Sequence, residues 1–227
     1  MIKQVFVRGV TYFVHALKTL FAPAYCVGCR ALLSDYFFCK PCLGMLRPLA
    51  SVKIMLTKKQ SATMHSLGLY QDPLVSLVWA KYYGNRLAAQ QLGYVIADRT
   101  VLSFIEFDYI VPVPLHWSRY AWRWYNQSEI MAQAVSERTG KPVVSLVKRV
   151  LFKKPQASLS RDERTANMAG VFTLAENAMQ YKGKSFLVID DVATSGATIR
   201  NVLHCLTKLA PVQLHAVVAC RTLSGID

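Results

Sequence analysis

Continuous apolar runs alternate with amphipathic stretches along most of the chain. Strands buried on both faces are expected at residues 64–70, 107–114, 143–147, 171–174, 185–190 and 213–220. Helices are expected where apolar residues recur every three or four positions, at residues 73–83, 87–97, 127–138 and 199–209. Strands that alternate with helices are typical of a parallel sheet flanked by helices, so the pattern predicts an α/β fold.

The first 60 residues do not follow this alternation. Apolar positions on one face of a helix recur over residues 1–21, and Pro23 ends that helix. Such a helix either packs against the rest of the protein or lies on a membrane surface. Residues 51–60 keep no apolar period and predict a linker. We therefore expect an N-terminal module at residues 1–50 and a larger domain at residues 61–227.

Residues 186–198 combine an apolar strand, two carboxylates, a loop rich in hydroxyl groups and the start of a helix. The N–H groups of such a loop and the positive end of the helix favour a phosphate, and the carboxylates suit sugar hydroxyls or Mg²⁺ bound through water. The predicted ligands are Asp190, Asp191, Val192, Ala193, Thr194, Ser195, Gly196, Ala197 and Thr198. The alternative is an ordinary strand–helix junction capped by Thr or Ser.

Two C-x₂-C pairs, Cys26/Cys29 and Cys39/Cys42, lie nine residues apart. Each pair presents two thiolates from a tight turn, and four such ligands suit a closed tetrahedral Zn²⁺ site with a structural role. A redox pair or an iron–sulfur cluster is the alternative. Cys205 and Cys220 fall in predicted core elements and are expected to be buried thiols, and four histidines in apolar patterns are expected to be structural: His15, His65, His204 and His215.

Composition adds a charge argument to this pattern. The 227 residues are 53% hydrophobic and carry a formal net charge of +14. Such an excess suggests a polyanionic partner, nucleic acid or anionic lipid, although a generically basic protein is the alternative. We find neither a stretch of eighteen uncharged apolar residues nor a signal peptide, so a cytoplasmic location with at most peripheral contact with the inner face of the membrane is expected.

Residues 116–125 interleave aromatic rings with arginines. This composition suits stacking on unpaired bases together with phosphate contacts, although about half of the rings are equally well explained as core. The predicted DNA-binding residues are Trp117, Arg119, Tyr120, Trp122, Arg123, Lys153 and Lys154.

These motifs together resemble known families. Residues 186–198 resemble the phosphoribosyl pyrophosphate (PRPP) motif of type I phosphoribosyltransferases. The whole chain resembles the ComF family, bacterial proteins in which a Cys₄ zinc module precedes a phosphoribosyltransferase-type domain. The matching hallmarks are the four cysteines, Lys81-Tyr82-Tyr83-Gly84, Val111 to His116, Arg119-x₃-Arg123-x₂-Asn126-Gln127, and Gln156-x₂-Leu159-x₄-Arg164-x₂-Asn167. One departure is Trp124, where family members usually have Gly.

The resemblance implies roles for three further groups of residues. A pyrophosphate-binding loop corresponds to Pro114, Leu115, His116, Arg119 and Arg123. A hood loop over residues 152–169 corresponds to Gln156, Arg161 and Arg164. Mg²⁺ accompanies PRPP in such proteins. No catalytic residue is assigned, and the candidates are Asp190, Asp191 and Arg164.

Two functions remain open. The first is a competence protein of natural transformation, which binds PRPP and handles internalised single-stranded DNA beside the uptake helicase or channel. The second is an active PRPP-dependent phosphoribosyltransferase of nucleotide metabolism, for which we identify no base-selecting residue. A third interpretation treats the zinc module as a docking platform for a protein partner. Whether the chain is an enzyme is therefore left open, because fold does not fix function.

Overall fold

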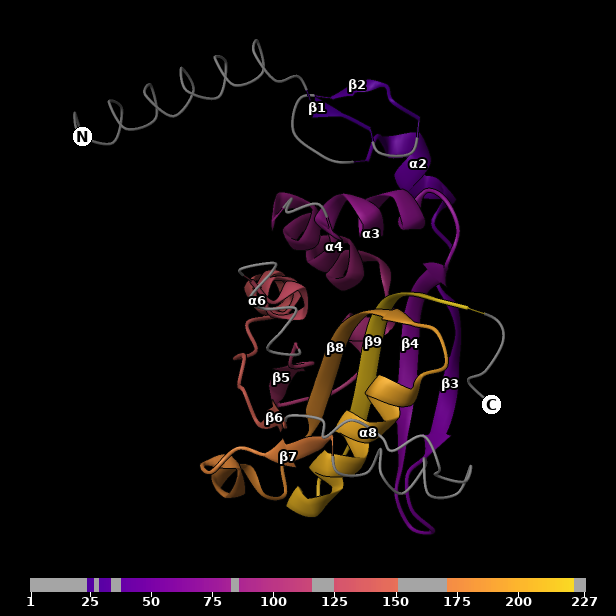
Figure 1. Cartoon of the computed structure of the whole chain (residues 1–227). Coiled ribbons are helices and arrows are strands. Elements are labelled where there is room, and N and C mark those ends of the chain that lie inside the picture. The colour runs from indigo at the N-terminus through magenta and orange to yellow at the C-terminus, as the bar shows by residue number, and fades with distance from the viewer. Residues whose placement is uncertain are drawn as a thin grey trace, which may run out of the picture. The chain divides into compact units, whose positions relative to one another are not determined.

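The computed structural model describes residues 24–26, 29–33, 38–82, 86–115, 125–150 and 171–222 (Figure 1). The chain divides into two compact units, Met1–Leu46 and Arg47–Asp227. Three predicted features lie outside the described residues: the helix at residues 1–21, the ring-rich segment at 116–124 and the polar hood segment at 152–169.

The N-terminal unit contains a small hairpin and one short helix among its described residues. Strands β1 (Ala24–Tyr25) and β2 (Leu32–Leu33) pair antiparallel, with Ala24 opposite Leu33. Helix α2 (Lys40–Met45) follows, with a proline in its first turn, where a missing N–H costs no helical hydrogen bond. So little secondary structure gives the unit few ways to bury apolar surface, which is typical of modules that depend on a metal.

The larger unit is built on a five-stranded sheet with the strand order β3-β4-β9-β8-β5 (Figure 1). These strands are β3 (Leu49–Met55), β4 (Ser61–Leu69), β9 (Leu214–Arg221), β8 (Phe186–Ala193) and β5 (Tyr109–Pro112). The last four run parallel, whereas the edge strand β3 is antiparallel to β4. The predicted α/β class with a parallel sheet is confirmed, and an antiparallel edge strand extends it.

Residues 51–60 are not the expected linker, because they form most of β3 and the turn into β4. The turn closes where the N–H groups of Leu56 and Thr57 both donate to the carbonyl of Gln60. A β-bulge between Leu49 and Val52 shifts the register, so the alternation of inward and outward side chains breaks within the strand. Beyond the bulge Val52, Ile54 and Leu56 alternate toward the core, so the linker prediction was wrong because a short strand period is followed at once by the polar turn.

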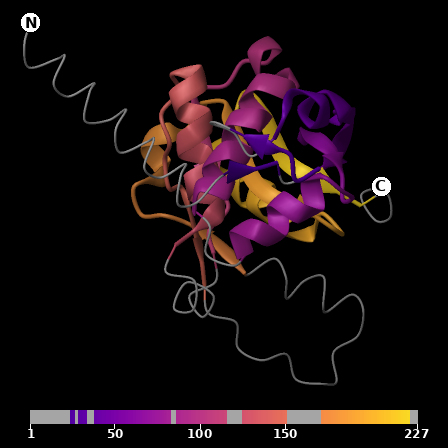
Figure 2. The same cartoon turned by 90° about the horizontal axis from the view of Figure 1, so that it is seen from above.

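The two faces of the sheet bury different helices. Helix α8 (Ala197–Leu206) supplies Ile199, Val202 and Leu203 to a core shared with Val188 and Ala216. The alternate residues of the same strands point to the opposite face. There α4 (Arg86–Arg99) contacts β9, and α6 (Gln127–Thr139) contacts β5 and β8. Helices α4 and α6 lie side by side in both views (Figures 1 and 2).

The remaining elements lie around this sheet. They are α3 (Leu74–Tyr82), the 3₁₀ helices η1 (Val101–Phe104), η2 (Ala178–Tyr181) and η3 (Thr207–Leu209), and the two-stranded pair β6 (Val147–Arg149) and β7 (Phe172–Leu174). The strand expected at residues 143–147 is corrected to Val147–Arg149, because Val143 makes only a single parallel bridge, to Ile110. Gly140 ends α6 in the left-handed conformation, as expected of a helix stop.

The buried thiols and histidines mostly match expectation. Cys205 and Cys220 are buried. His65 of β4 stacks on His215 of β9, with ring centroids 5.5 Å apart. Burial, and secondarily His215, lower the pKa of His65 to about 4. His204 was expected to be structural but is exposed on α8, so it is not part of the core.

Candidate functional site

The predicted phosphate motif forms the expected strand, loop and helix. Strand β8 is buried from Phe186 to Asp190 because it lies between β5 and β9 inside the sheet. Helix α8 starts after Gly196, whose φ of 67° is a left-handed conformation that favours glycine. The two carboxylates therefore lie in β8 just past Ile189, the last residue that pairs with β5, and the hydroxyl-bearing loop begins a helix.

The carbonyl groups of Ala193, Thr194 and Gly196, around this loop, all accept hydrogen bonds from within the protein. Thr222 follows β9, and its N–H and side-chain hydroxyl donate to the carbonyls of Ala193 (3.2 Å) and Thr194 (2.8 Å). The carbonyl of Gly196 accepts from the N–H of Arg200 at 2.9 Å. A loop whose carbonyls have partners of this kind, at a helix N-terminus, suits an anion.

A cavity of about 330 Å³ lies where β4, β5, β8 and β9 end. Among the predicted ligands it is lined by Asp190, Asp191, Val192, Thr194 and Thr198, and from the predicted pyrophosphate loop by Pro114 and Leu115. Ala193, Ser195, Gly196 and Ala197 belong to the loop without lining the cavity. Ligands in open α/β sheets bind at the carboxyl ends of the strands, which is where this cavity lies.

Several predicted residues lie outside the described part of the chain. They are His116, Trp117, Arg119, Tyr120, Trp122, Arg123, Lys153, Lys154, Gln156, Arg161 and Arg164. Their assignments to the pyrophosphate loop, to the hood and to DNA binding stay predictions.

The cavity also contains residues that the sequence did not assign to it: Tyr70, Gln127, Ser128, Arg149 and Thr222. Tyr70 and Thr222 directly follow β4 and β9, so the rule that parallel strands meet at their carboxyl ends was an available signal. Gln127 belongs to the Asn126-Gln127 hallmark, to which no role was given. Nothing in the sequence marked Ser128 or Arg149 as neighbours of the carboxylates.

Asp190 is buried to 9% exposure and is held by hydrogen bonds. Its Oδ1 atom accepts from the Ser128 hydroxyl and from the Asp191 N–H, each at 2.9 Å. The Asp191 Oδ1 atom accepts from the Val192 N–H at 2.6 Å. Burial of a carboxylate is costly unless it is hydrogen-bonded, so these bonds allow two acidic groups to stand at the end of a core strand.

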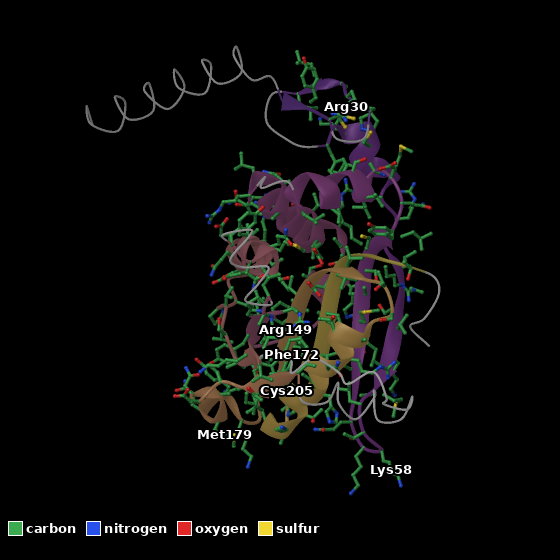
Figure 3. The ribbon with its side chains drawn as sticks, in the orientation of Figure 1. Arg30, Lys58, Arg149, Phe172, Met179 and Cys205 are labelled. Carbon is green, nitrogen blue, oxygen red and sulfur yellow. The ribbon has the colours of Figure 1, made fainter. Side chains whose placement is uncertain are left out.

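Arg149 brings a cation to the same cavity. It ends β6, and its guanidinium carbon lies 5.5 Å from the ring centroid of Phe172 on β7 (Figure 3). Just beyond this pair, the Val150 N–H donates to the Val171 carbonyl at 2.9 Å. Val150 and Val171, the described residues on either side of the predicted hood segment, are therefore joined beside a residue that lines the cavity.

The four N-terminal cysteines form a separate cluster. Their sulfur atoms all lie within 4.8 Å of one another, and those of Cys29 and Cys39 are 3.6 Å apart. Sulfur ligands at 2.3 Å from a tetrahedral zinc ion are about 3.8 Å apart, so the arrangement fits zinc. Burial and the neighbouring thiols raise the pKa of Cys42 to about 12. A cation that compensates thiolate charge is therefore what this donor set needs, and the cluster can bind zinc.

No helix within the described residues has the length and apolar character needed to cross a membrane.

A family model described as a phosphoribosyl transferase domain matches residues 110–227. That span contains β5, α6, β8, α8 and β9, which carry most of the cavity. The larger unit is therefore a domain of the phosphoribosyltransferase class.

Two named relatives identify the family to which the chain belongs within this class. "Competence protein F" of Haemophilus influenzae is 27% identical over 193 residues, which are 81% of this chain and 84% of that protein. "DNA utilization protein YhgH" of Salmonella typhi is 32% identical over 166 residues, which are 70% of this chain and 71% of that protein. The chain belongs to the ComF-type family.

Solved structures show a likeness of fold. The glutamine PRPP amidotransferase of B. subtilis is 19% identical, with a TM-score of 0.43, over 59% of this chain and 26% of that chain. Adenine phosphoribosyltransferase of Thermoanaerobacter pseudethanolicus is 12% identical, with a TM-score of 0.41, over 80% of this chain and 98% of that chain.

Proposed function

We propose that the cavity binds PRPP or a related phosphoribosyl ligand. The observation that carries this proposal is that one cavity brings Pro114 and Leu115 together with Asp190, Asp191 and the loop before α8. In this proposal the 5′-phosphate lies at residues 194–198 and the ribose hydroxyls bond Asp190 and Asp191. The diphosphate lies at the loop after β5, where His116, Arg119 and Arg123 add donors and charge. Mg²⁺ accompanies the diphosphate and is held through water by the carboxylates.

The test of ligand binding is calorimetric titration with PRPP and Mg²⁺. The wild-type protein should bind PRPP, and the double variant Asp190→Asn/Asp191→Asn should lose at least about tenfold in affinity, because each amide both removes charge and offers hydrogen-bond donors to a hydroxyl. Glu129→Gln, a change in the first turn of α6 outside the cavity lining, is the matched control. Equal affinity of the double variant and the wild type would contradict the proposal.

The biological role that we propose is in natural transformation. The protein would act in the cytoplasm, where it handles internalised single-stranded DNA beside the uptake helicase or channel. The names of the two relatives, a competence protein and a DNA utilization protein, support this role. The net charge of +14 supports a polyanionic partner. The proposed DNA contacts are the rings and cations of residues 117–123 together with Lys153 and Lys154.

The DNA proposal is tested by binding of fluorescent single-stranded oligonucleotides at several salt concentrations. Phosphate contacts release counterions, so the logarithm of the affinity should fall linearly with the logarithm of the salt concentration. Replacing Arg119 and Arg123 with Gln should reduce that slope, whereas Lys141→Gln, an exposed change after α6, should reduce it less. Absent or salt-independent binding would contradict the proposal.

Catalysis of phosphoribosyl transfer is the second candidate function, and the same cavity favours it. Its test is the release of pyrophosphate from PRPP and Mg²⁺ in the presence of a panel of bases and amines. Release with one acceptor, lost in the Asp190→Asn/Asp191→Asn variant, would establish an enzyme. No release with any acceptor would leave the cavity as a ligand-binding site.

We propose a structural zinc ion on Cys26, Cys29, Cys39 and Cys42, in a module that contacts either DNA or a protein partner. Removal of this module distinguishes a DNA contact from a protein contact. A shorter protein that still binds DNA would favour contact between the module and a protein partner. The shortened protein should begin at Arg47, since β3 starts at Leu49 and a cut at residue 50 would remove part of the sheet.

A further inference from the structure

The N-terminus of α6 contacts the segment that leads out of β5. Asn126 precedes this helix, and its Nδ2 atom donates to the Val113 carbonyl at 3.1 Å. The Oδ1 atom of the same side chain accepts from the Ser128 N–H at 3.2 Å. A helix N-cap needs only this second bond, because an Asp residue, whose carboxylate has no donor, caps equally well. The bond to Val113 therefore does something other than start the helix.

The same helix end also holds a carboxylate of the cavity. The Ser128 hydroxyl donates to the Oδ1 atom of Asp190 at 2.9 Å, and Ser128 is only 5% exposed. That oxygen also accepts from the Asp191 N–H, so the orientation of the carboxylate is fixed from two directions. Between the two bonding residues lies Gln127, which is buried and lines the cavity.

These bonds close into a circuit through the sheet. The Val113 N–H donates to the Ile189 carbonyl at 3.0 Å, and Ile189 directly precedes Asp190 on β8. Val113 is thus tied to β8 by its own N–H and to α6 by its carbonyl. Asp190 is tied to the same helix by its side chain. Two segments far apart in the sequence, at residues 113 and 190, are therefore joined both by the bond between Val113 and Ile189 and, through Asn126 and Ser128, by the N-terminus of α6.

We propose that Asn126 and Ser128 are positioning residues that hold the ribose-binding carboxylate and the diphosphate-binding loop at the separation that a phosphoribosyl diphosphate requires. This inference rests on the proposed binding of PRPP. It gives a role to the Asn126-Gln127 hallmark. Ser128 acts on the ribose end through Asp190, whereas Asn126 acts on the diphosphate end through Val113.

The ribose end is tested with Ser128→Ala in the full-length protein. The probes are ribose 5-phosphate and 2-deoxyribose 5-phosphate, which differ only in the hydroxyl next to the anomeric carbon. The wild type should prefer the ribose compound, and Ser128→Ala should reduce that preference about five- to tenfold, the effect of one ordinary hydrogen bond. Ser128→Thr keeps the hydroxyl and should keep the preference. Ser136→Ala, on the same helix, is the control, and an unchanged preference in Ser128→Ala would overturn the proposal.

The diphosphate end is tested with Asn126→Ser, which retains a neutral N-cap but is too short to reach the Val113 carbonyl. PRPP affinity should fall about five- to tenfold, while affinity for ribose 5-phosphate, which lacks the diphosphate, should stay within about twofold. An equal loss for both ligands would mean that Asn126 serves the fold alone and would overturn its part of the proposal.

A measurement without ligand separates this inference from the proposed function. If the wild type binds no phosphoribosyl compound, the proposed function fails, and the circuit is judged by NMR of the ligand-free protein. The Asp191 N–H shares its acceptor with the Ser128 hydroxyl, so Ser128→Ala should shift the Asp191 amide resonance, and Ser136→Ala should not. An unmoved resonance would overturn the positioning role whatever the ligand.

Discussion

Asp190 and His65 are both buried polar residues of the sheet, but their surroundings differ. Asp190 lies in β8 just past the last residue that pairs with β5, where it lines the cavity and accepts from the Ser128 hydroxyl and the Asp191 N–H. His65 lies within β4, where its Nδ1 atom is 2.8 Å from the Ser51 hydroxyl and its Nε2 atom is 3.3 Å from the His215 Nδ1 atom. The first residue lines the cavity that we propose as a ligand site, and the second belongs to a hydrogen-bonded structural pair.

The histidine pair predicts a loss of stability in mild acid. Burial lowers the pKa of His65 to about 4 and also lowers the pKa of His215. Above about pH 6.5 both folded and unfolded states hold neutral rings, and stability is full. Between about pH 6.5 and 4 these two histidines bind protons in the unfolded state but stay neutral in the folded state. The free energy of unfolding should therefore fall by about 1–2 kcal/mol.

Urea denaturation across this pH range checks the prediction. His65→Gln should flatten the decline, and His204→Gln, which alters an exposed histidine, should leave it in place. A decline of equal size in both variants would assign the effect to other groups.

Single residues also show what the sequence could predict. The run Phe186–Ile189 identified β8 because a strand between two parallel neighbours is apolar on both faces. The cysteine spacing identified the metal cluster because short turns impose it locally. Ser128 and Arg149 escaped prediction because their neighbours in the cavity come from other elements, and only the tertiary fold brings them together.

Helix α4 and helix α6 approach each other closely at a glycine. A Cβ atom on Gly93 would lie 2.6 Å from the Met131 carbonyl oxygen and 2.7 Å from the Ala134 Cβ atom. Both obstacles are rigid, since one is backbone and the other is the first atom of a side chain. Because α6 carries Asn126 and Ser128, the closeness of this helix pair also sets where these residues meet the cavity.

Gly93→Ala should therefore destabilise the larger unit by about 1–3 kcal/mol, as overpacking does in well-packed cores. Thermal or urea denaturation measures the change. Gly44→Ala is the control, because a Cβ atom there meets nothing within 4 Å. Wild-type stability of Gly93→Ala would show that α4 and α6 can separate without cost.

The short elements of the N-terminal unit depend on the cysteine cluster. We expect about one zinc ion per chain by elemental analysis, since four thiolates complete a tetrahedral site. Chelation should unfold this unit and leave the larger one folded, because the sheet has its own core. NMR resolves the two outcomes: signals of residues 38–46 should collapse while those of β8 and β9 persist. Unchanged signals after complete zinc removal would contradict the prediction.

The molecule as a whole combines a cavity of about 330 Å³ with a large excess of positive charge. Such an excess raises the affinity for a polyanion across a wide surface, whereas we propose one compact ligand for the cavity. The edge strand β3 escaped prediction for a reason at this scale. The strand is short and leads into a turn with Lys58 and Lys59, so this stretch resembles a solvated linker until its pairing with β4 is known.

Linkage between the two ligands is the prediction that belongs to the whole molecule. If PRPP and single-stranded DNA both bind, any change that PRPP makes in the affinity for DNA must equal the change that DNA makes in the affinity for PRPP. Competition should appear as a joint weakening, because Arg119 and Arg123 are proposed for both ligands. Titrations in both directions at fixed salt measure the two factors. Independent binding would mean that the ligands share no residues.

The cavity is assembled from six separate stretches of chain, the first at Tyr70 and the last at Thr222. A fragment that starts after Tyr70 or stops before Thr222 therefore lacks a wall, however well it folds. Shortening the larger unit from its C-terminal side should remove Thr222, and with it part of the site, before any residue of β9 is lost, whereas shortening from the N-terminal side removes β3 and β4 before it reaches Tyr70. Limited proteolysis can exploit this property, because a ligand held by so many stretches should protect bonds far from one another along the chain.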